Sequence, residues 1–227
     1  MWLLPSRGRE QMCQQALDAF AQHGSTPGVL YVHASTYGEM SLPDGWTRKN
    51  GDEWQAAQMN WLFSEYPDEP WYGWIADDNF PQTPGFDKAL IEAAGNNRMI
   101  WCNGATRKTP AKWDSEKSVP SHIPSCMMWG GDLVRAAGWW APPWVTHATI
   151  DETWKVFCME TGRAGYLHNV VVRHLRAKEG RQRDATDKAP RPFFSPDMGK
   201  FKAWRESGGV QKLNATVTSY LSERASP

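Results

Sequence analysis

The sequence predicts an α/β fold in which a mostly parallel central sheet is flanked by helices. Short apolar runs rich in branched and aromatic residues alternate along the chain with longer segments of helical periodicity. Gly and Pro punctuate the junctions between these segments. With 227 residues, the chain is long enough for one sizeable core and short for two. Alternating strands and helices of this kind build a single layered domain.

The first 35 residues predict a strand, a helix and a second strand. The first strand, Trp2–Pro5, is an apolar run ended by proline, and the polar loop "SRGR" follows it. A helix over Glu10–His23 places its apolar residues near one face and closes at Gly24. The second strand, Gly28–Ser35, is rich in Val, Leu and Tyr. Such units place ligand sites at the C-terminal ends of their strands.

The same alternation continues through the middle of the chain. Segments with helical spacing of apolar residues are followed by short, strongly apolar runs. We expect a helix, a strand, a helix and a strand, in that order, at Asp52–Pro67, Trp71–Asn79, Thr83–Gly95 and Arg98–Gly104.

The second half of the chain combines regular elements with two polar segments. The first polar segment, Pro110–His122, has the composition of a surface loop or flap. The elements predicted after it are two helices and a strand, at Gly131–Ala137, Ile150–Gly162 and Ala164–Leu175. The second polar segment, Ala177–Asp197, has almost no aliphatic side chains, so we expect it to be mobile without ligand. A last helix is predicted over Val210–Ala225.

Composition limits where the protein acts and what it binds. Lys plus Arg equals Asp plus Glu at 25 each, so no global field attracts nucleic acid or an anionic membrane. No apolar stretch approaches the roughly 20 residues of a membrane helix, and the opening residues are too soon polar for a signal peptide. We therefore expect a cytoplasmic protein. The four cysteines form no CxxC pair and are expected to be buried, reduced thiols.

Two adjacent carboxylates, Asp77 and Asp78, end the apolar run of the stretch "YGWIADDNFPQTPGF". One interpretation is an acidic turn that caps the next helix, since Asp and Asn are common in such turns. The heavily apolar strand before them instead favours a place at the open edge of the sheet, where ligands bind. A divalent cation shared with a phosphate would relieve their repulsion, because hard oxygen ligands suit Mg²⁺ or Mn²⁺.

Five motifs, by their order and spacing, carry a resemblance to a known family. They are "LLPSRGR" at the first strand, "GWIADDNFPQTPGFDKAL" in the middle, then "GGDLVRAAGWW", "HATIDETW" and "YLHNVVVRHL". Together they resemble a GT-A glycosyltransferase of the family 2 type, especially its short bacterial and phage-borne members, from Leu3 to about Leu175. The resemblance implies a Rossmann-like GT-A catalytic domain over residues 1–176. Residues 177–227 would then form a flexible loop or lid and a C-terminal helix packed on that domain.

The resemblance also implies an activity and its participants. A sugar would move from a nucleotide-diphosphate donor, UDP-sugar foremost, to an acceptor hydroxyl. A divalent cation, Mn²⁺ or Mg²⁺, would hold the diphosphate. A nucleotide diphosphate leaves poorly until its developing negative charge is neutralised, so cationic groups in a shielded site suit this chemistry.

The resemblance also implies roles for individual residues, according to their positions in the matching motifs. The loop lining the donor nucleotide corresponds to Pro5, Ser6, Arg7 and Arg9. The doublet corresponds to the metal-and-ribose motif, with Asp78 as metal ligand and Asp77 on the ribose or on metal-bound water. His174 matches a late histidine near the metal, and Asp151 matches the base that activates the acceptor.

Two features depart from the family pattern. The acidic motif usually has acids at its first and third positions, whereas "ADDN" places Ala76 and Asn79 around the doublet. Which aspartate contacts metal is therefore open. The second strand ends in "YVHAS" without the acid that often recognises the nucleotide base, so Ser35 and Tyr37 are the candidates there.

Each assignment has an ordinary structural alternative. The two loop arginines could be solvated charges, although a place between a strand and a helix favours phosphate contact. Asp151 could be the N-cap of the following helix, and it could equally accept the acceptor's proton. His174 could be a strand-end histidine or could complete a metal shell. His147 is interpreted as a loop residue rather than an acceptor contact.

The chain has 14 tryptophans, most of which we expect in the core. Three of them lie in "GWWAPPWV", between the donor side and Asp151. They could pack under the proline-rich turn. If one is exposed, its ring could stack on a sugar or base of the acceptor, and we select Trp140 and Trp144 for this role.

Other functional classes are weighed against this one. Sugar nucleotidyltransferases share the α/β layout but use a glycine-rich phosphate loop, which "LLPSRGR" is not. A P-loop kinase is excluded because no GxxxxGK[ST] motif is present. A non-catalytic nucleotide- or sugar-binding module with a degenerate GT-A site stays as an alternative because Ala76 replaces an acid.

The acceptor is open between a saccharide, a small molecule and a hydroxymethylated pyrimidine in DNA, as in phage glycosyltransferases of that type. The zero net charge argues against DNA, since duplex binding depends on phosphate neutralisation. A basic run could clamp donor phosphates, hold a polyanionic acceptor or be a solvated tail. Its residues are Arg173, Arg176, Lys178, Arg181 and Arg183.

Overall fold

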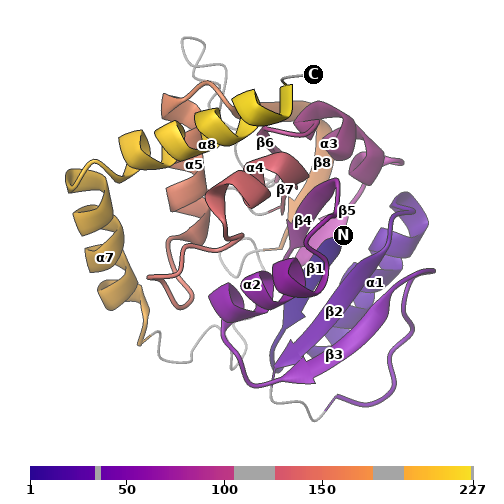
Figure 1. The fold of residues 1–227 in the computed structure, drawn as a ribbon. Helices are drawn as coiled ribbons and strands as arrows, with labels where there is room; N and C mark the ends of the chain where they lie inside the picture. The colour runs from indigo at the N-terminus through magenta and orange to yellow at the C-terminus, as the bar shows by residue number, and fades with distance from the viewer. Residues whose placement is uncertain (34–36, 105–125, 176–191, 226–227) are drawn as a thin grey trace.

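The computed structural model describes residues 1–33, 37–104, 126–175 and 192–225, and it shows a central sheet covered by helices (Figure 1). The strands of these ranges are β1 Trp2–Ser6, β2 Gly28–His33, β3 Thr47–Gly51, β4 Trp71–Ile75, β5 Asn79–Pro81, β6 Met99–Asn103, β7 Cys126–Gly130 and β8 Ala164–His174. The helices are α1 Glu10–His23, α2 Gln55–Glu65, α3 Phe86–Ala94, α4 Gly131–Ala137, α5 Ile150–Glu160, α7 Phe194–Glu206 and α8 Gly209–Ala225. The predicted α/β class is confirmed.

The sheet has eight strands in the order β3-β2-β1-β4-β7-β6-β8-β5 among the residues described. Strands β3, β2, β1 and β4 are parallel neighbours, and β8 is parallel to β6. Strand β7 runs antiparallel between β4 and β6, and β5 pairs antiparallel with β8 at the edge. Within the described ranges the sheet is therefore mixed, with four parallel and three antiparallel pairings, so the expected mostly parallel sheet is confirmed but is not purely parallel.

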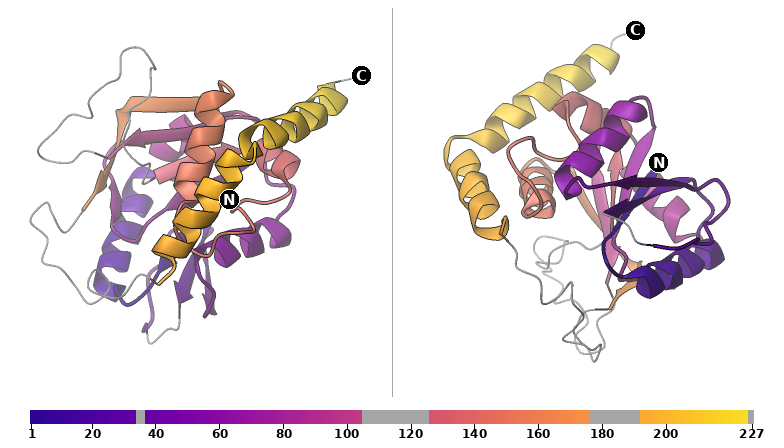
Figure 2. Two further views of the ribbon diagram at one scale, coloured as in Figure 1. Left: turned by 90° about the vertical axis from the view of Figure 1, so that its left-hand side faces the viewer. Right: turned by 90° about the horizontal axis from the view of Figure 1, so that it is seen from below.

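Alternating side chains of the strands build two cores, one on each face of the sheet. Helices α2, α4, α5 and α8 cover one face, and α1 and α3 cover the other (Figures 1 and 2). In β1, Leu3 belongs to the first core, whereas Trp2 and Leu4 belong to the second. The Trp2 ring lies flat against Gly73 of β4, where a Cβ atom would approach it to 2.4 Å. Glycine at position 73 therefore permits this packing.

Tryptophans fill much of the interior, as the sequence predicts. The fully buried ones are Trp2, Trp101, Trp129, Trp140 and Trp154. All four cysteines are likewise buried and unpaired, in agreement with the expectation of reduced thiols. No helix in the described ranges is long and apolar enough to cross a membrane.

Several elements were missed or differ from those predicted. Strand β3 has the polar sequence "TRKNG" and gains its order by pairing with β2 at the edge of the sheet. Strand β7 is a short apolar run that directly precedes α4. The predicted strand Trp71–Asn79 divides into β4, a turn and β5.

The C-terminal segment also differs from the prediction. Residues 194–197, assigned by composition to a mobile segment, begin helix α7, in which Asp197 is buried. Helix α8 then packs on α4 and α5, and Val210, Leu213 and Val217 join the core there. The predicted flap at 110–122 and most of the polar segment 177–197 lie outside the described residues.

Candidate active site

The aspartate doublet occupies the turn between β4 and β5, at the edge of the sheet where β1 also ends. The amide of Asn79 donates to the carbonyl of Ala76 at 3.1 Å, which closes the turn. The carbonyl of Asp78 accepts a 2.8 Å hydrogen bond from the amide of Leu175, just after β8. Both aspartates are buried, at 6% and 8% exposure. The two acids thus lie at the end of an apolar strand, as expected, but they are buried in this structure.

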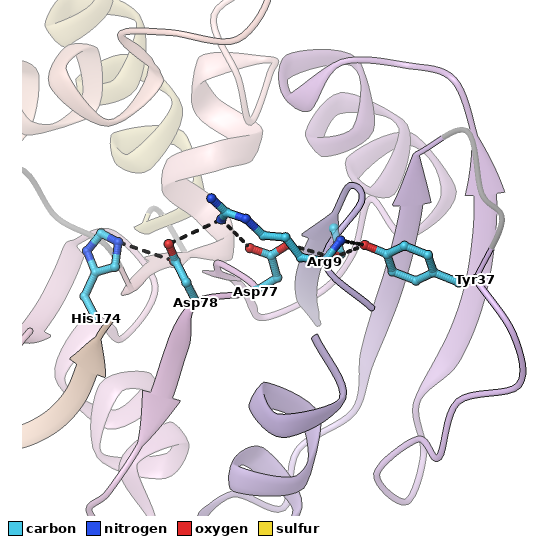
Figure 3. A network of polar contacts seen from close by, with 6 residues as sticks. Arg9, Tyr37, Asp77, Asp78 and His174 are labelled. Carbon is cyan, nitrogen blue, oxygen red and sulfur yellow. Dashed lines mark hydrogen bonds and ion pairs between the residues drawn. The ribbon is translucent and has the colours of Figure 1, made fainter. Parts of the chain in front are cut away.

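Asp77 is held by residues that follow β1. The hydroxyl of Ser6 donates to Oδ2 of Asp77 at 2.7 Å, and Nη1 of Arg9 lies 3.1 Å from Oδ1 (Figure 3). The hydroxyl of Tyr37 lies 2.9 Å from that of Ser6 and accepts from the amide of Arg9 at 2.5 Å. The structure therefore brings together four sequence-predicted residues: Ser6, Arg9, Tyr37 and Asp77.

Asp78 joins the same network from its other side. Its Oδ2 lies 3.4 Å from Nη1 of Arg9, and its Oδ1 lies 3.3 Å from Nε2 of His174 (Figure 3). This approach follows from the sheet, because Asn79 of β5 pairs directly with His174 of β8. Arg9 thus bridges both aspartates, and His174 contacts one of them.

The electrostatics of the doublet follow from burial. Burial raises the pKa of Asp77 to about 6; the Arg9 guanidinium opposes this shift and the neighbouring Asp78 adds to it. Desolvation disfavours the charged carboxylate more than one cation can compensate. Burial therefore favours the protonated form of Asp77, and further positive charge beside it would favour the ionised form.

The side chains of Asp78 and His174 fit a divalent cation in their chemistry. A carboxylate oxygen and an imidazole nitrogen that converge within 3.3 Å suit Mn²⁺, and oxygen ligands suit Mg²⁺. Within the described ranges, no group of three or more His, Cys, Asp or Glu side chains forms a ready metal site. A cation held by Asp78 and His174 could take its remaining ligands from phosphate oxygens and water.

Arg7 lies beside the network and stacks on an aromatic side chain that the sequence reasoning missed. Its guanidinium carbon lies 4.5 Å from the ring centre of Trp54, just before α2. The Trp54 ring also contacts His33 at 5.4 Å, His147 at 5.5 Å and Phe193 at 4.8 Å, measured between ring centroids. In the sequence, Trp54 looks like an apolar residue at the start of a helix, and nothing there indicates its contact with Arg7.

Pro5 and Ser35 were also predicted to contact the donor nucleotide. Pro5 lies within β1, directly before Ser6, and pairs with Tyr31 of β2. Ser35 lies outside the described residues.

Asp151 lies in the first turn of α5 and is not its N-cap. The N-cap is Thr149, which makes no side-chain capping hydrogen bond, so the alternative role proposed for Asp151 is wrong. Burial first, and then the charge of the adjacent Glu152, raises the pKa of Asp151 to about 7. Its side chain keeps partial surface exposure although it is deeply surrounded by protein. In the described part of the chain, no hydrogen bond or ion pair links Asp151 to the aspartate doublet.

The two tryptophans selected as acceptor contacts lie in different environments. Trp140 has no exposed surface and packs against Tyr72 and Trp129, so it cannot present a ring to an acceptor. Its selection was wrong because the turn folds this ring into the core. Trp144 is half-buried and stacks on Trp204 of α7 at 5.6 Å.

Comparisons with known proteins agree on the fold. No protein-family model matches the chain, and no curated protein matches it in sequence. Among solved structures, it resembles the mannosyltransferase PcManGT from Pyrobaculum calidifontis in complex with GDP-Man and Mn²⁺. The TM-score is 0.56 at 13% identity, over 99% of this chain and 74% of that one.

The chain also resembles two structures of S. aureus TarS. The TM-scores are 0.52 and 0.53 at 9% and 10% identity, over 78% and 75% of this chain. The match spans 37% of one TarS chain and 58% of TarS 1-349, which is less than two thirds of each. At these identities the likeness shows the fold, which this chain shares with a glycosyltransferase.

Proposed function

We propose that this chain is a metal-dependent glycosyltransferase that moves a sugar from a nucleotide-diphosphate donor to an acceptor hydroxyl. The observation that carries the proposal is the buried aspartate doublet, with Arg9 on one side and His174 on the other. Burying two adjacent carboxylates is costly, and a bound cation would lower that cost beyond what the Arg9 pairing provides. The fold shared with a mannosyltransferase bound to GDP-Man and Mn²⁺ supports the same class of reaction.

Asp78 and His174 would hold the divalent cation, Mn²⁺ or Mg²⁺. When bound, this cation would neutralise negative charge on the departing nucleotide diphosphate. Asp78 and His174 are the proposed ligands because their oxygen and nitrogen atoms converge. Asp77, fixed by Ser6 and Arg9, is proposed to contact the ribose or metal-bound water.

The donor nucleotide would lie along the loop that follows β1. Arg7 and Arg9 bring two positive charges to the edge of the sheet beside the doublet. We retain Pro5, Ser6 and Ser35 as donor contacts. The resemblance in the sequence favours a UDP-sugar, whereas the similar mannosyltransferase binds GDP-Man, so both donors belong in the assay.

Asp151 is proposed as the base that takes the proton from the acceptor hydroxyl. A base works best when its pKa lies near the working pH, and burial raises the pKa of Asp151 to about 7. A substantial fraction of Asp151 would therefore be ionised at neutral pH while still binding a proton well. Trp144 remains a proposed acceptor contact, and the acceptor class stays between saccharide, small molecule and modified DNA base.

The proposal is tested by release of nucleotide diphosphate from UDP-glucose and GDP-mannose. We expect release with Mn²⁺ that EDTA abolishes and added Mn²⁺ restores. Asp151→Asn should lose release and keep nucleotide binding, whereas Asp78→Ala should lose metal-dependent binding as well. If Asp78→Ala leaves both manganese affinity and release unchanged, the proposal is wrong.

One observation favours a second candidate, a binding module without turnover. Arg9 already contacts both aspartates, so the protein itself supplies part of the charge that a cation would supply. Such a module would bind UDP or GDP in calorimetry without metal. It would release no nucleotide from either sugar donor, with or without Mn²⁺.

A further inference from the structure

Asp197, in the first turn of α7, is a buried carboxylate that receives hydrogen bonds from three successive backbone amides. Its side chain is 1% exposed. The amide of Thr146 lies 3.1 and 3.0 Å from its two oxygens, and those of His147 and Ala148 donate to Oδ2 at 2.8 and 2.9 Å. Asp197 thus organises a loop that is about 50 residues away in the sequence.

These amides are the main partners of the carboxylate. The ammonium group of Lys200 lies 3.9 Å from Oδ1, and its side chain is half-exposed, so the ion pair is peripheral. Backbone amides converging on one oxygen form a compact cradle for a negative charge. Neutralising or moving this charge would remove the hydrogen bonds that hold the loop to α7.

The loop that Asp197 holds leads directly into the helix carrying Asp151. Its last residue, Thr149, has a φ of 66° and is the sole non-glycine residue with positive φ in the ranges described. A β-branched residue adopts this conformation only where its surroundings impose it. Three amide contacts directly before Thr149 supply such a constraint, so the start of α5 is set by α7 as well as by its own sequence.

The same loop borders the candidate active site. The ring of His147 lies 5.5 Å from that of Trp54, and Trp54 in turn carries the guanidinium of Arg7. The residues bound by Asp197 therefore connect the donor side, through Trp54, with the first turn of α5. A shift of the loop would move Asp151 relative to the donor.

We infer that Asp197 is a positioning residue that holds the segment 146–149, and with it Asp151, in the geometry required for sugar transfer. This inference rests on the proposed function. It assigns the C-terminal helical segment a part in the reaction although none of its residues touches the doublet in the described structure. Proton acceptance by Asp151 needs hydrogen-bond reach, and a misplacement of about 1 Å can reduce a rate about 100-fold.

The test compares Asp197→Asn with a matched substitution elsewhere. Asn retains the size but turns one acceptor oxygen into a donor that faces the amides. The control is Asp87→Asn, because Asp87 of α3 is fully buried and accepts from the amides of Ser25 and Thr26, just before β2. Both variants should unfold at lower temperature than the wild type.

The deciding measurement separates nucleotide affinity from turnover. In Asp197→Asn, the rate of nucleotide release from UDP-glucose or GDP-mannose should fall about 10- to 100-fold. The Kd for UDP or GDP with Mn²⁺ should change less than about threefold, because the doublet is untouched. In Asp87→Asn, both quantities should stay near wild type at temperatures where the protein is folded.

A second variant guards against loss of folding. Asp197→Glu keeps the charge but places it one methylene further out, so it displaces the loop without removing the acceptor. It should show the same separation of rate from affinity. Hydrogen exchange at Thr146, His147 and Ala148 should accelerate in either Asp197 variant and not in Asp87→Asn.

The outcomes distinguish failure of the proposed function from failure of the role inferred for Asp197. If wild type releases no nucleotide, the proposed function fails. If wild type is active and folded Asp197 variants release nucleotide at the wild-type rate, the inference about Asp197 fails alone. Equal losses of rate and affinity, or equal rate losses in Asp87→Asn, would mean that Asp197 only stabilises the fold, which also overturns it.

Discussion

Nη1 of Arg9 lies 3.1 Å from Oδ1 of Asp77, although the two residues are separated by 68 positions in the sequence. The contact joins the loop after β1 to the turn after β4. It is almost enclosed, with 12% and 9% of the two side chains exposed. This ion pair therefore contributes to both the charge balance of the site and the stability of the sheet edge.

Removing Arg9 should destabilise the protein in a pH-dependent way. In Arg9→Ala, the carboxyl of Asp77 loses the cation that opposes its raised pKa, so that pKa should rise above about 6. At pH 8 the unpaired buried charge should cost about 3 kcal/mol of unfolding free energy, and at pH 5 less, because Asp77 is then protonated.

Urea unfolding at the two pH values measures this difference. Arg205→Ala is the control, since Arg205 pairs with Glu160 at the exposed surface and should cost under about 1 kcal/mol at either pH. An equal loss at pH 5 and pH 8 in Arg9→Ala would contradict the predicted charge effect.

Asp151→Asn should change activity and stability in opposite directions. Below a pH near 7 Asp151 is increasingly protonated, so the wild-type rate should rise with pH through about 7 and the variant should be inactive throughout. The folded-state pKa of Asp151 exceeds its ordinary 3.8. Its contribution to the free energy of unfolding is therefore fully present below pH 3.8 and is lost as the pH rises through about 7.

The neutral Asn residue avoids that loss. At pH 8, Asp151→Asn should therefore unfold at a higher temperature than wild type, while at pH 4 the two should be similar. Glu152→Gln serves as the comparison for the adjacent acid. If Glu152→Gln abolishes release and Asp151→Asn does not, Glu152 takes the role of the base.

Metal affinity should depend on Asp78 and His174 together. We expect Asp78→Ala and His174→Ala each to weaken Mn²⁺ binding at least about tenfold, measured by calorimetry in the presence of GDP or UDP. Asp44→Ala, which removes an exposed carboxylate, should leave it unchanged. Loss of affinity in Asp78→Ala alone would remove His174 from the proposed ligands.

Substitutions of Trp140 and Trp144 should differ in their effects on stability and on activity. Trp140→Ala should cost about 3 to 5 kcal/mol of unfolding free energy, because it empties a fully buried site between Tyr72 and Trp129. Trp144→Leu should cost much less, since that ring is only half-buried. A fall in acceptor-dependent rate for Trp144→Leu, without a change in donor Kd, would support its contact with the acceptor.

Sequence patterns located much of the fold because local periodicity and burial agree there. Helices α1 and α4 begin and end where predicted, since their apolar spacing and flanking glycines act locally. Strand β3 escaped prediction because the order of "TRKNG" comes from pairing with β2 rather than from its own side chains. The antiparallel direction of β7 likewise depends on a connection that the sequence does not specify.

The same contrast applies to the candidate site. The aspartate doublet was recognisable because two acids at the end of a buried strand are unusual in themselves. Trp54 and Asp197 carried no such signal, because their roles arise from partners far away in the chain. Trp140 shows the opposite error, since it was selected as an acceptor contact from its place before a proline-rich turn, whereas the tertiary fold buries it.

Pairing of Asn79 with His174 across β5 and β8 has a consequence for how the protein matures. The first residues of the polar network leave the ribosome long before His174 does. A nascent chain that has completed β1 to β5 carries both aspartates yet lacks the histidine. The contact between His174 and Asp78 can therefore form only after β8 has been synthesised.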